Sequence, residues 1–438
     1  MTTDAYDPRT ALLAVPMSRF QKIAVTVVFL LCMLDGLDVM AITFAAPAIR
    51  AQWGLTPATV GLVFSAGLFG MAAGSLFLAP LADVVGRRQL IFLSLIMMIA
   101  GTLWSAVSAN ITSLLWSRVF TGVGIGAMVA VISSLTAEYS NTRNRDFCQS
   151  IFSVGFPIGG LLGGILAGVV LPVYGWQSIF YIASLLGVAL IPVVGFFVPE
   201  PIAPMIARPK HDTLARVNHY LRRCGMAAID ALPPPPAAAR GLPLKALFDS
   251  GMAGLTLTIT AIYFLHVMTL FFVQNWAPSL VASLGFDPGR AAMIAVFVNV
   301  GGIIGSPLLG ATSMRFGLKR LVVSAMCAGA VVTALFSVLP PHFAILALGS
   351  AAMGFFLQSA MMGLYAIIAR TFPAHVRASG TGFVIGVGRI GSAISPLIAG
   401  ALMTGGFSRG SVAILLACPA LVAAFLLLTF RVQSANTP

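Results

Sequence analysis

Charged residues are scarce in this sequence of 438 residues: only 8% are charged, whereas 59% are hydrophobic. Soluble globular proteins carry about 25% charged residues, so this composition excludes a soluble protein and predicts a protein that spans the lipid bilayer several times. Acidic residues are fewer than basic ones, 12 against 25, and the net charge is +13. The basic residues are divided among short loops rather than gathered in a stripe or tail, which argues against nucleic acid as a partner.

Cysteine and histidine are also rare, with five residues of each. The cysteines are scattered and odd in number, and the sequence contains no CxxC motif and no His-rich cluster. This pattern excludes a disulfide framework and a zinc site, and we expect no metal and no cofactor. The sequence also has no HExxH motif and no GxSxG motif with catalytic partners, so we do not expect an enzyme.

Long apolar runs, separated by charged and turn residues, predict an all-α membrane protein with twelve spanning helices. The predicted spans are 23–49, 58–82, 89–108, 111–137, 148–172, 176–198, 251–275, 290–313, 320–339, 342–369, 378–404 and 411–430. Twenty of the 25 Lys and Arg residues fall in segments that this topology places on the side of the two termini. The positive-inside rule therefore predicts cytoplasmic N- and C-termini, and we expect a bacterial inner-membrane protein.

A polar, basic segment with a run of four prolines divides the spans into two groups of six. We expect three parts: a six-helix bundle, a cytoplasmic linker and a second six-helix bundle, at residues 1–198, 199–248 and 249–438. Within the linker, the apolar residues of DTLARVNHYLRRC share one helical face and the arginines lie on the others. This pattern predicts a short helix that lies on anionic lipid.

The two halves of the sequence repeat at a nearly constant offset. At 231 residues, Leu34-Asp35 aligns with Leu265-His266 and Ala46-Pro47 aligns with Ala277-Pro278. Parallel six-helix repeats are typical of transporters with their sites near the midplane between the halves. The sequence therefore predicts two pseudo-symmetric bundles.

Two acidic residues, Asp35 and Asp38, lie inside the first predicted span. Their spacing puts them on one helix face, and Asp35 lies about 20 Å from Lys22, near the middle of a ~30 Å hydrocarbon core. An acid at this depth costs at least about 2.5–3.5 kcal/mol on insertion scales, so such residues face a cavity or a partner. We predict that they carry protons. The alternative is a structural pair bound by serines and backbone groups.

Three basic or titratable residues also fall inside predicted spans. Arg389 lies about 17 Å into the eleventh span, and a guanidinium matches a carboxylate, so we predict that it anchors an anionic substrate. The alternative is a permanent ion pair with Asp35 or Asp38. Arg118 is predicted either to help attract the anion or to act as a hydrogen-bond hub. His266, which aligns with Asp35 in the repeat, is predicted either to take part in proton coupling or to be merely hydrogen-bonded.

Amide and aromatic side chains complete the predicted substrate site, because they can bind ring hydroxyls and stack on an aromatic ring. They are Gln274, Asn275, Trp276, Gln358 and Tyr365. At the cytoplasmic side we expect a gate, in which Asp83 accepts hydrogen bonds from the start of the eleventh span near Ser379. The other predicted gate residues are Gly86, Arg87, Arg88, Glu138 and Arg143. The alternative for the basic residues is that they only set the topology.

Several of these motifs resemble a known family. APLADVVGRR, residues 79–88, resembles the GxLADRxGRR signature of the major facilitator superfamily, with Ala79 and Val84 as departures, and RVFTGVGIGA resembles its RxxxGxGxG motif. Within that superfamily, DGLD at 35–38, NWAPSLV and GRIG resemble the aromatic acid:proton symporters. The resemblance implies the major facilitator fold and the uptake of benzoate-like carboxylates with protons by alternating access. We also expect a monomer.

Two alternatives to this function remain. One is a carrier of the same superfamily for another organic anion, a sugar or a drug. The other is a membrane sensor that does not transport.

Overall fold

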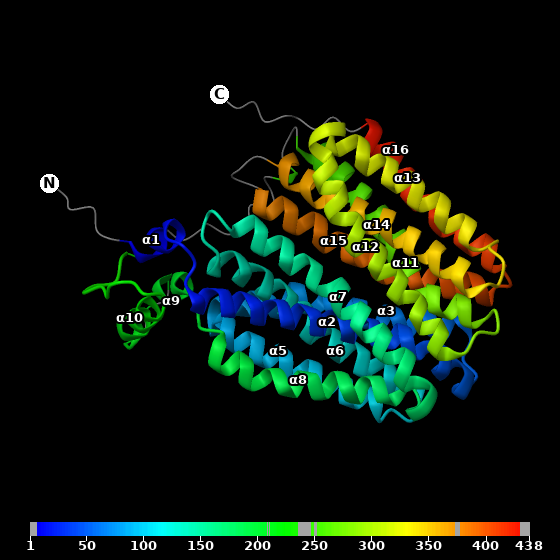
Figure 1. Cartoon of the computed structure of the whole chain (residues 1–438), viewed down its shortest axis with the longest axis horizontal. Coiled ribbons are helices and arrows are strands. Elements are labelled where there is room, and N and C mark those ends of the chain that lie inside the picture. The colour runs from blue at the N-terminus through cyan, green and yellow to red at the C-terminus, as the bar shows by residue number, and fades with distance from the viewer. Residues whose placement is uncertain are drawn as a thin grey trace.

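The computed structural model describes residues 7–207, 209, 211–234, 247–248, 252–372 and 377–429, without the side chains of residues 83, 146, 314, 369 and 377–379. Within these residues, twelve helices are long and apolar enough to cross a membrane, which confirms the predicted all-α fold with twelve spans. They form two bundles (Figure 1). The first bundle contains α2 (Arg19–Trp53), α3 (Pro57–Ala73), α5 (Arg87–Ala106), α6 (Ile111–Tyr139), α7 (Arg145–Tyr174) and α8 (Gln177–Phe197). The second contains α11 (Ala253–Ala282), α12 (Pro288–Phe316), α13 (Leu318–Phe336), α14 (Phe343–Thr371), α15 (Arg377–Thr404) and α16 (Arg409–Thr429).

One span extends well beyond its predicted end, whereas the others begin and end within a few residues of the prediction. The second span reaches Leu81 because Gly74–Leu78 and Ala79–Leu81 continue α3 in π-helical and 3-10 form. The seventh span, α11, continues to Ala282 although Pro278 lies inside it. Proline is tolerated in membrane helices because neighbouring groups satisfy the backbone atoms that it frees. As a consequence, Gln274, Asn275 and Trp276 lie within a continuous helix rather than at its end.

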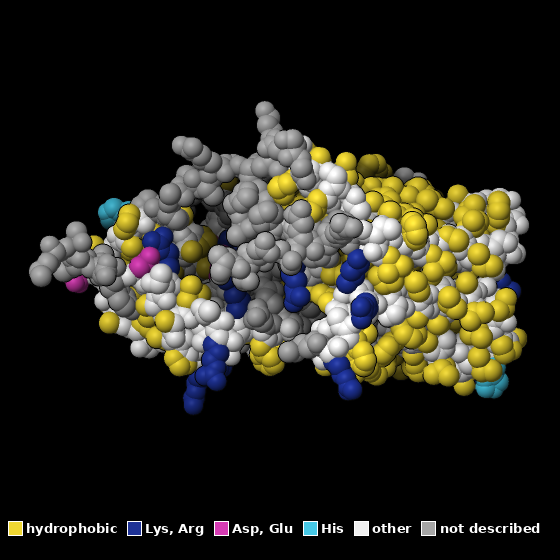
Figure 2. Space-filling view, turned by 90° about the horizontal axis from the view of Figure 1, so that it is seen from above, with side chains coloured by type: hydrophobic (Ala, Val, Ile, Leu, Met, Phe, Trp, Pro, Cys, Tyr) yellow, Lys and Arg dark blue, Asp and Glu magenta, His cyan; other side chains and the backbone are white. Residues whose placement is uncertain are grey.

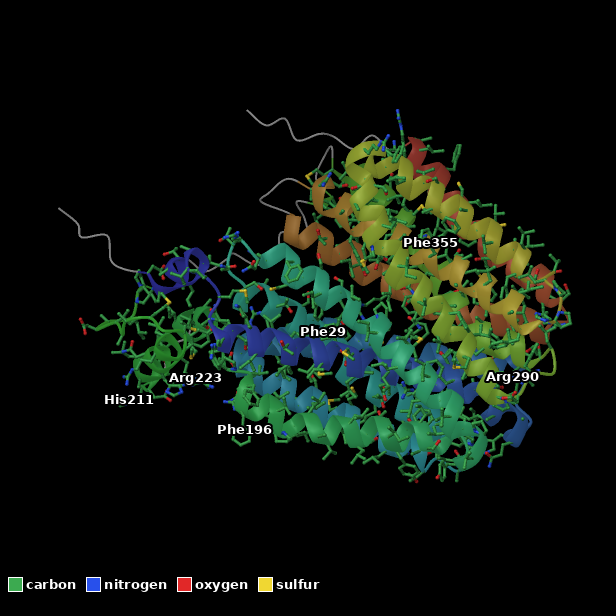
Figure 3. All side chains as sticks on the ribbon, in the orientation of Figure 1. Phe29, Phe196, His211, Arg223, Arg290 and Phe355 are labelled. Carbon is green, nitrogen blue, oxygen red and sulfur yellow. The ribbon has the colours of Figure 1, made fainter. Side chains whose placement is uncertain are left out.

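The molecule has two chemically different ends. Two short helices, α9 (Ile202–Ala207) and α10 (Thr213–Arg223), lie beyond the bundles at one end, which we call the linker end (Figure 1). His211 and Arg223 lie there, whereas Arg290 lies at the opposite, distal end (Figure 3). Figure 2 shows hydrophobic side chains over much of the flank between the ends, with Lys and Arg concentrated towards the linker end. An apolar flank of this kind faces lipid in a membrane protein.

The linker helix α10 is placed differently from the prediction. Its apolar residues Val217, Tyr220 and Leu221 are buried in the protein. The Tyr220 ring meets the Phe20 ring edge-on at 5.7 Å, and the Arg223 guanidinium lies 3.9 Å from the centroid of that same Phe20 ring. The prediction that this face lies on lipid is therefore wrong, because the start of α2 offers an aromatic surface that covers it. Burial also raises the pKa of the Cys224 thiol at the end of α10.

The two bundles are in backbone contact near the distal end. A Cβ atom added to Gly61 of α3 would lie 2.4 Å from the Pro396 carbonyl oxygen of α15. A Cβ atom added to Gly400 would lie equally close, 2.4 Å, to the Pro57 carbonyl oxygen. Between α7 and α12, Gly289 permits a similarly close approach. Glycine at these positions lets the helices approach closely and closes the distal end between the bundles.

Candidate functional site

Asp38 and Arg118 form a buried ion pair inside the first bundle. Arg118 Nη2 lies 3.4 Å from Asp38 Oδ2, and the two side chains are only 3% and 1% exposed. Thr102 Oγ1 donates to the other carboxylate oxygen, Asp38 Oδ1, at 2.6 Å. Helices α2, α5 and α6 therefore supply three groups whose ionic attraction and hydrogen bonding replace the interactions with water that each group loses on burial.

Asp35 lies one turn before Asp38 but has a different environment. It is 0% exposed, and neither of its carboxylate oxygens has a hydrogen-bond partner among the described residues. Asp38 repels its negative charge, and Arg389 attracts it from the second bundle. An ionised carboxylate without a hydrogen-bonding partner is costly to bury, so this position is suited to binding a proton.

Arg389 does not form the ion pair that the sequence offered as an alternative. Among the described residues, the structure records no ion pair for Arg389, while Asp38 pairs with Arg118 instead. The reason is that α6 packs against α2 within the same bundle, whereas α15 belongs to the other bundle. The guanidinium of Arg389 is therefore available to an anion.

Arg389 lies where the two bundles diverge along α15. Gly382, Gly386, Arg389, Pro396 and Gly400 follow one another at helical spacing, so they lie along one face of the helix. The distal residues of this face, Pro396 and Gly400, contact α3 closely, whereas a Cβ atom added to Gly382 or Gly386 would meet no atom of the described residues within 4 Å. The α15 face is therefore closed towards the distal end and open towards the linker end.

A small cavity links the Arg118 ion pair to the contact between the bundles. Its volume is about 10 Å³, and its lining includes Arg118 from α6 and Asn275 from α11. This volume is near the minimum for one water molecule. The Nε and Nη1 atoms of Arg118 have no hydrogen-bond partner among the described residues, so two donors remain for a ligand. A larger cavity of about 40 Å³, between α11, α13, α14 and α16, includes none of the predicted site residues.

Trp276 and His266 are held by protein contacts. Trp276 is 1% exposed, its Nε1 donates to the Pro396 carbonyl oxygen at 3.3 Å, and its ring meets Phe64 edge-on. Trp276 thus belongs to the contact between the bundles and is not free to stack on a ligand in this state. His266 Nε2 lies 3.0 Å from the Leu357 carbonyl oxygen, while its Nδ1 has no partner among the described residues.

The predicted amide and phenol groups are mostly buried, and several keep unpaired atoms. Gln274 and Gln358 are each 6% exposed, and Gln274 Oε1 and Gln358 Nε2 have no partner in the described structure. Asn275 Oδ1 accepts a hydrogen bond from Thr43 Oγ1 of the first bundle at 3.3 Å. The hydroxyls of Tyr365 and Tyr263 lie 3.2 Å apart.

Four residues of this region were not predicted from the sequence, and they are Thr43, Thr102, Tyr263 and Asn299. A threonine or tyrosine in an apolar span gives no distinct signal, because both are common at lipid-facing and packed positions. Asn299 did have a signal, since a strongly polar side chain in a span usually faces the bundle interior.

At the linker end, the predicted gate contains an ion pair and a helix cap. Arg87 Nη2 lies 2.8 Å from Glu138 Oε1. Glu200, which was also not predicted from the sequence, accepts hydrogen bonds from the main-chain N–H groups of Arg87 at 2.8 Å and Arg88 at 2.9 Å. Gly86 makes the preceding turn with φ of +108°, a conformation that glycine adopts most readily. These contacts join α5, α6 and the start of the linker.

Two members of the predicted gate are not part of this network as the structure describes it. Arg143 is exposed in the turn between α6 and α7. The side chains of Asp83 and Ser379 lie outside the described residues, so their contact stays a prediction.

Comparisons with known proteins agree with this architecture. Residues 28–273 and 259–438 match the family model described as Major Facilitator Superfamily. The chain is 30% identical to a gallate transporter of Pseudomonas putida, over 94% of this chain and 92% of that protein. It is 27% identical to the 4-hydroxybenzoate transporter PcaK of Acinetobacter baylyi, over 93% and 91% of the two chains. Its fold is similar to a partially occluded inward open conformation of the xylose transporter XylE from E. coli, with a TM-score of 0.75, 16% identity and coverage of 96% and 100%.

Proposed function

Since the chain belongs to the Major Facilitator Superfamily and is therefore a multi-pass secondary transporter rather than an enzyme, we propose that it takes up small aromatic carboxylates together with protons. The relatives that carry gallate and 4-hydroxybenzoate support this substrate class. The basic residues near the linker end support an orientation in which the linker end faces the cytoplasm of a bacterial cell. Both termini then lie on that side of the inner membrane. The described state then opens towards the cytoplasm.

The observation that carries this proposal is the Arg118–Asp38 ion pair beside the cavity between the bundles. A substrate carboxylate that binds the two free donors of Arg118 competes with Asp38 for the guanidinium. The freed Asp38 loses its counter-charge, and binding a proton then removes the cost of its burial. Anion binding and proton binding are thereby coupled in one site.

Asp35 and Arg389 complete the proposed cycle. A protonated Asp35 carries no charge, so the bundles can rock without moving an ionised carboxylate that has no described hydrogen-bonding partner, whereas an ionised Asp35 would oppose the movement. Arg389, at the edge of the region open to the linker end, receives the carboxylate on the second bundle. One proton with one monoanion is electroneutral, so the pH gradient drives uptake by about 1.36 kcal/mol per unit. A second proton would add about 2.3 kcal/mol per 100 mV of membrane potential.

We propose that the other predicted residues support this cycle. Asn275 and Tyr365 line the substrate path, and His266 assists proton movement through its Nδ1 atom, which has no partner among the residues that the structure describes. At the linker end, the Arg87–Glu138 ion pair and the Glu200 cap join α5 to α6 and to the linker, so this end of the first bundle moves as one unit.

The test is uptake of radiolabelled 4-hydroxybenzoate into proteoliposomes with an imposed pH gradient. Asp35→Asn and Asp38→Asn are expected to reduce gradient-driven accumulation at least about tenfold while substrate exchange continues, because exchange needs no net proton movement. Arg389→Ala is expected to reduce both activities. The matched control is Asp287→Asn at an exposed distal position, which should behave like the unmodified protein. Full accumulation by all three site variants would refute the coupling model.

A further inference from the structure

Two tyrosines of the second bundle share a hydrogen bond between their hydroxyl groups. The hydroxyl oxygens of Tyr263 on α11 and Tyr365 on α14 lie 3.2 Å apart, and the ring centroids lie 5.8 Å apart. Among the described residues, the structure records no other hydrogen bond for either hydroxyl. A phenol has one hydrogen to donate, and only one of the two phenols can donate within the pair. The other O–H group is therefore left for a further acceptor.

Burial determines which of the two O–H groups is left. Tyr263 is 2% exposed, and its ring rests on the backbone of α15, because a Cβ atom added to Gly388 would overlap the ring. Tyr365 is partly exposed. A buried donor without an acceptor is costly, so the Tyr263 O–H donates to the Tyr365 oxygen. The free O–H is then that of Tyr365, the more accessible member of the pair.

The tyrosine pair lies beside Arg389. Arg389 directly follows Gly388, so the Tyr263 ring packs against the turn of α15 that carries the guanidinium. The positive charge of Arg389 is close enough to act on the phenol groups of both tyrosines, and it also acts on Asp35 of the first bundle. Like Tyr365, Arg389 is partly exposed. One phenol O–H and one guanidinium therefore lie near each other at accessible positions of the second bundle.

We propose that Tyr365 binds the carboxylate of the transported acid together with Arg389, and that Tyr263 is a positioning residue that orients the Tyr365 hydroxyl. This inference rests on the proposed function. A carboxylate has two oxygens that only accept hydrogen bonds, so it can bind the guanidinium and the phenol O–H at the same time. The bond that Tyr263 donates polarises the Tyr365 O–H and strengthens its bond to the anion. Tyr365 thus contacts the charged end of the substrate rather than its ring.

The main test is Tyr365→Phe, which removes the hydroxyl and keeps the ring. The assay is exchange of radiolabelled benzoate and 4-hydroxybenzoate across proteoliposome membranes. A lost hydrogen bond to a charged group should raise KM about 10- to 100-fold, with a maximal rate within about twofold of the unmodified protein. Because both acids carry the same carboxylate, KM should rise by the same factor for each. A bond from Tyr365 to the ring hydroxyl would instead raise KM for 4-hydroxybenzoate alone.

The positioning role of Tyr263 is tested by Tyr263→Phe, alone and combined with Tyr365→Phe. Alone, it should raise KM for both acids by about two- to tenfold, because it removes one hydrogen bond between neutral groups. In the Tyr365→Phe background it should raise KM no further, whereas an independent structural effect would add to the first. The control is Tyr181→Phe on α8, whose side chain is 47% exposed, and it should keep KM for both acids.

Three results would overturn this inference. They are an unchanged KM in Tyr365→Phe, a rise confined to 4-hydroxybenzoate, and additive effects of the two substitutions. In each case, continued accumulation of both acids by the unmodified protein with a pH gradient would leave the proposed function standing. If the unmodified protein neither exchanges nor accumulates an aromatic carboxylate, the proposed function fails and this inference fails with it.

Discussion

Removal of Arg118 should lower the free energy of unfolding more than removal of an arginine from an exposed ion pair, because its partner Asp38 is buried. Arg118→Gln leaves a carboxylate that is 1% exposed with Thr102 as its remaining described partner. Breaking a buried ion pair by removing one partner typically costs about 3–5 kcal/mol, because an uncompensated charge stays in the interior. Removing both charges, with Asp38→Asn in addition, should restore most of this loss. We therefore expect a coupling energy of at least about 2 kcal/mol between the two positions.

The measurement is a double-mutant cycle on the free energy of unfolding in detergent micelles. The matched control is the Arg290–Asp287 ion pair, whose side chains are 67% and 53% exposed, and whose cycle should give less than about 1 kcal/mol. The Arg118→Gln, Asp38→Asn double variant should still fold but should no longer accumulate substrate with a pH gradient. A coupling energy as small as that of the control pair would show that Arg118 and Asp38 do not depend on each other, and the proposed competition for the guanidinium would be refuted.

Three further predictions concern the two ends of the molecule. Glu200→Gln removes the charge that caps the start of α5 and should lower the free energy of unfolding by about 0.5–1 kcal/mol in denaturant titrations; an unchanged value would contradict the cap. Burial raises the pKa of the Cys224 thiol, so less thiolate is present at pH 8 than in a free cysteine, and maleimide labelling of a variant with Cys224 alone should keep rising above pH 8.5. Labelling that already levels off below that pH would count against the burial. Gly400→Val should separate α15 from α3, so a cysteine placed at Ala58 should be labelled faster from the distal side than in the Gly400 background, and equal rates would argue against the closed distal contact.

The residues of the gate were predicted only in part from the sequence. The GRR motif identified Gly86 and the two arginines that follow it, because this segment resembles the signature of the superfamily. Glu200 was missed because it lies more than 100 residues away, at the start of a linker that has no signal for a contact with α5. The same limit applies to Thr102, which is an ordinary residue of an apolar span until the packing of α5 against α6 and α8 brings its hydroxyl to Asp38.

At the linker helix α10, the sequence predicted the wrong partner for a correctly identified surface. Its apolar face was recognised correctly, but the partner of that face was not. An amphipathic pattern specifies that one face is buried, and lipid and protein are equally apolar partners for it. The Phe20 ring, which covers this face, belongs to a different part of the sequence.

The sequence by itself determined that this protein has twelve spans in two related bundles and which polar residues lie in the hydrocarbon region. These properties depend on local composition, because hydrocarbon excludes charges and unsatisfied backbone groups wherever a chain crosses it. Only the tertiary structure decided that Asp38 pairs with Arg118, that Arg389 stays unpaired among the described residues, and that Asn299 faces the first bundle. Helical periodicity assigns a residue to a face but does not say which neighbouring helix covers that face, since this choice is made by close packing between segments far apart in the sequence.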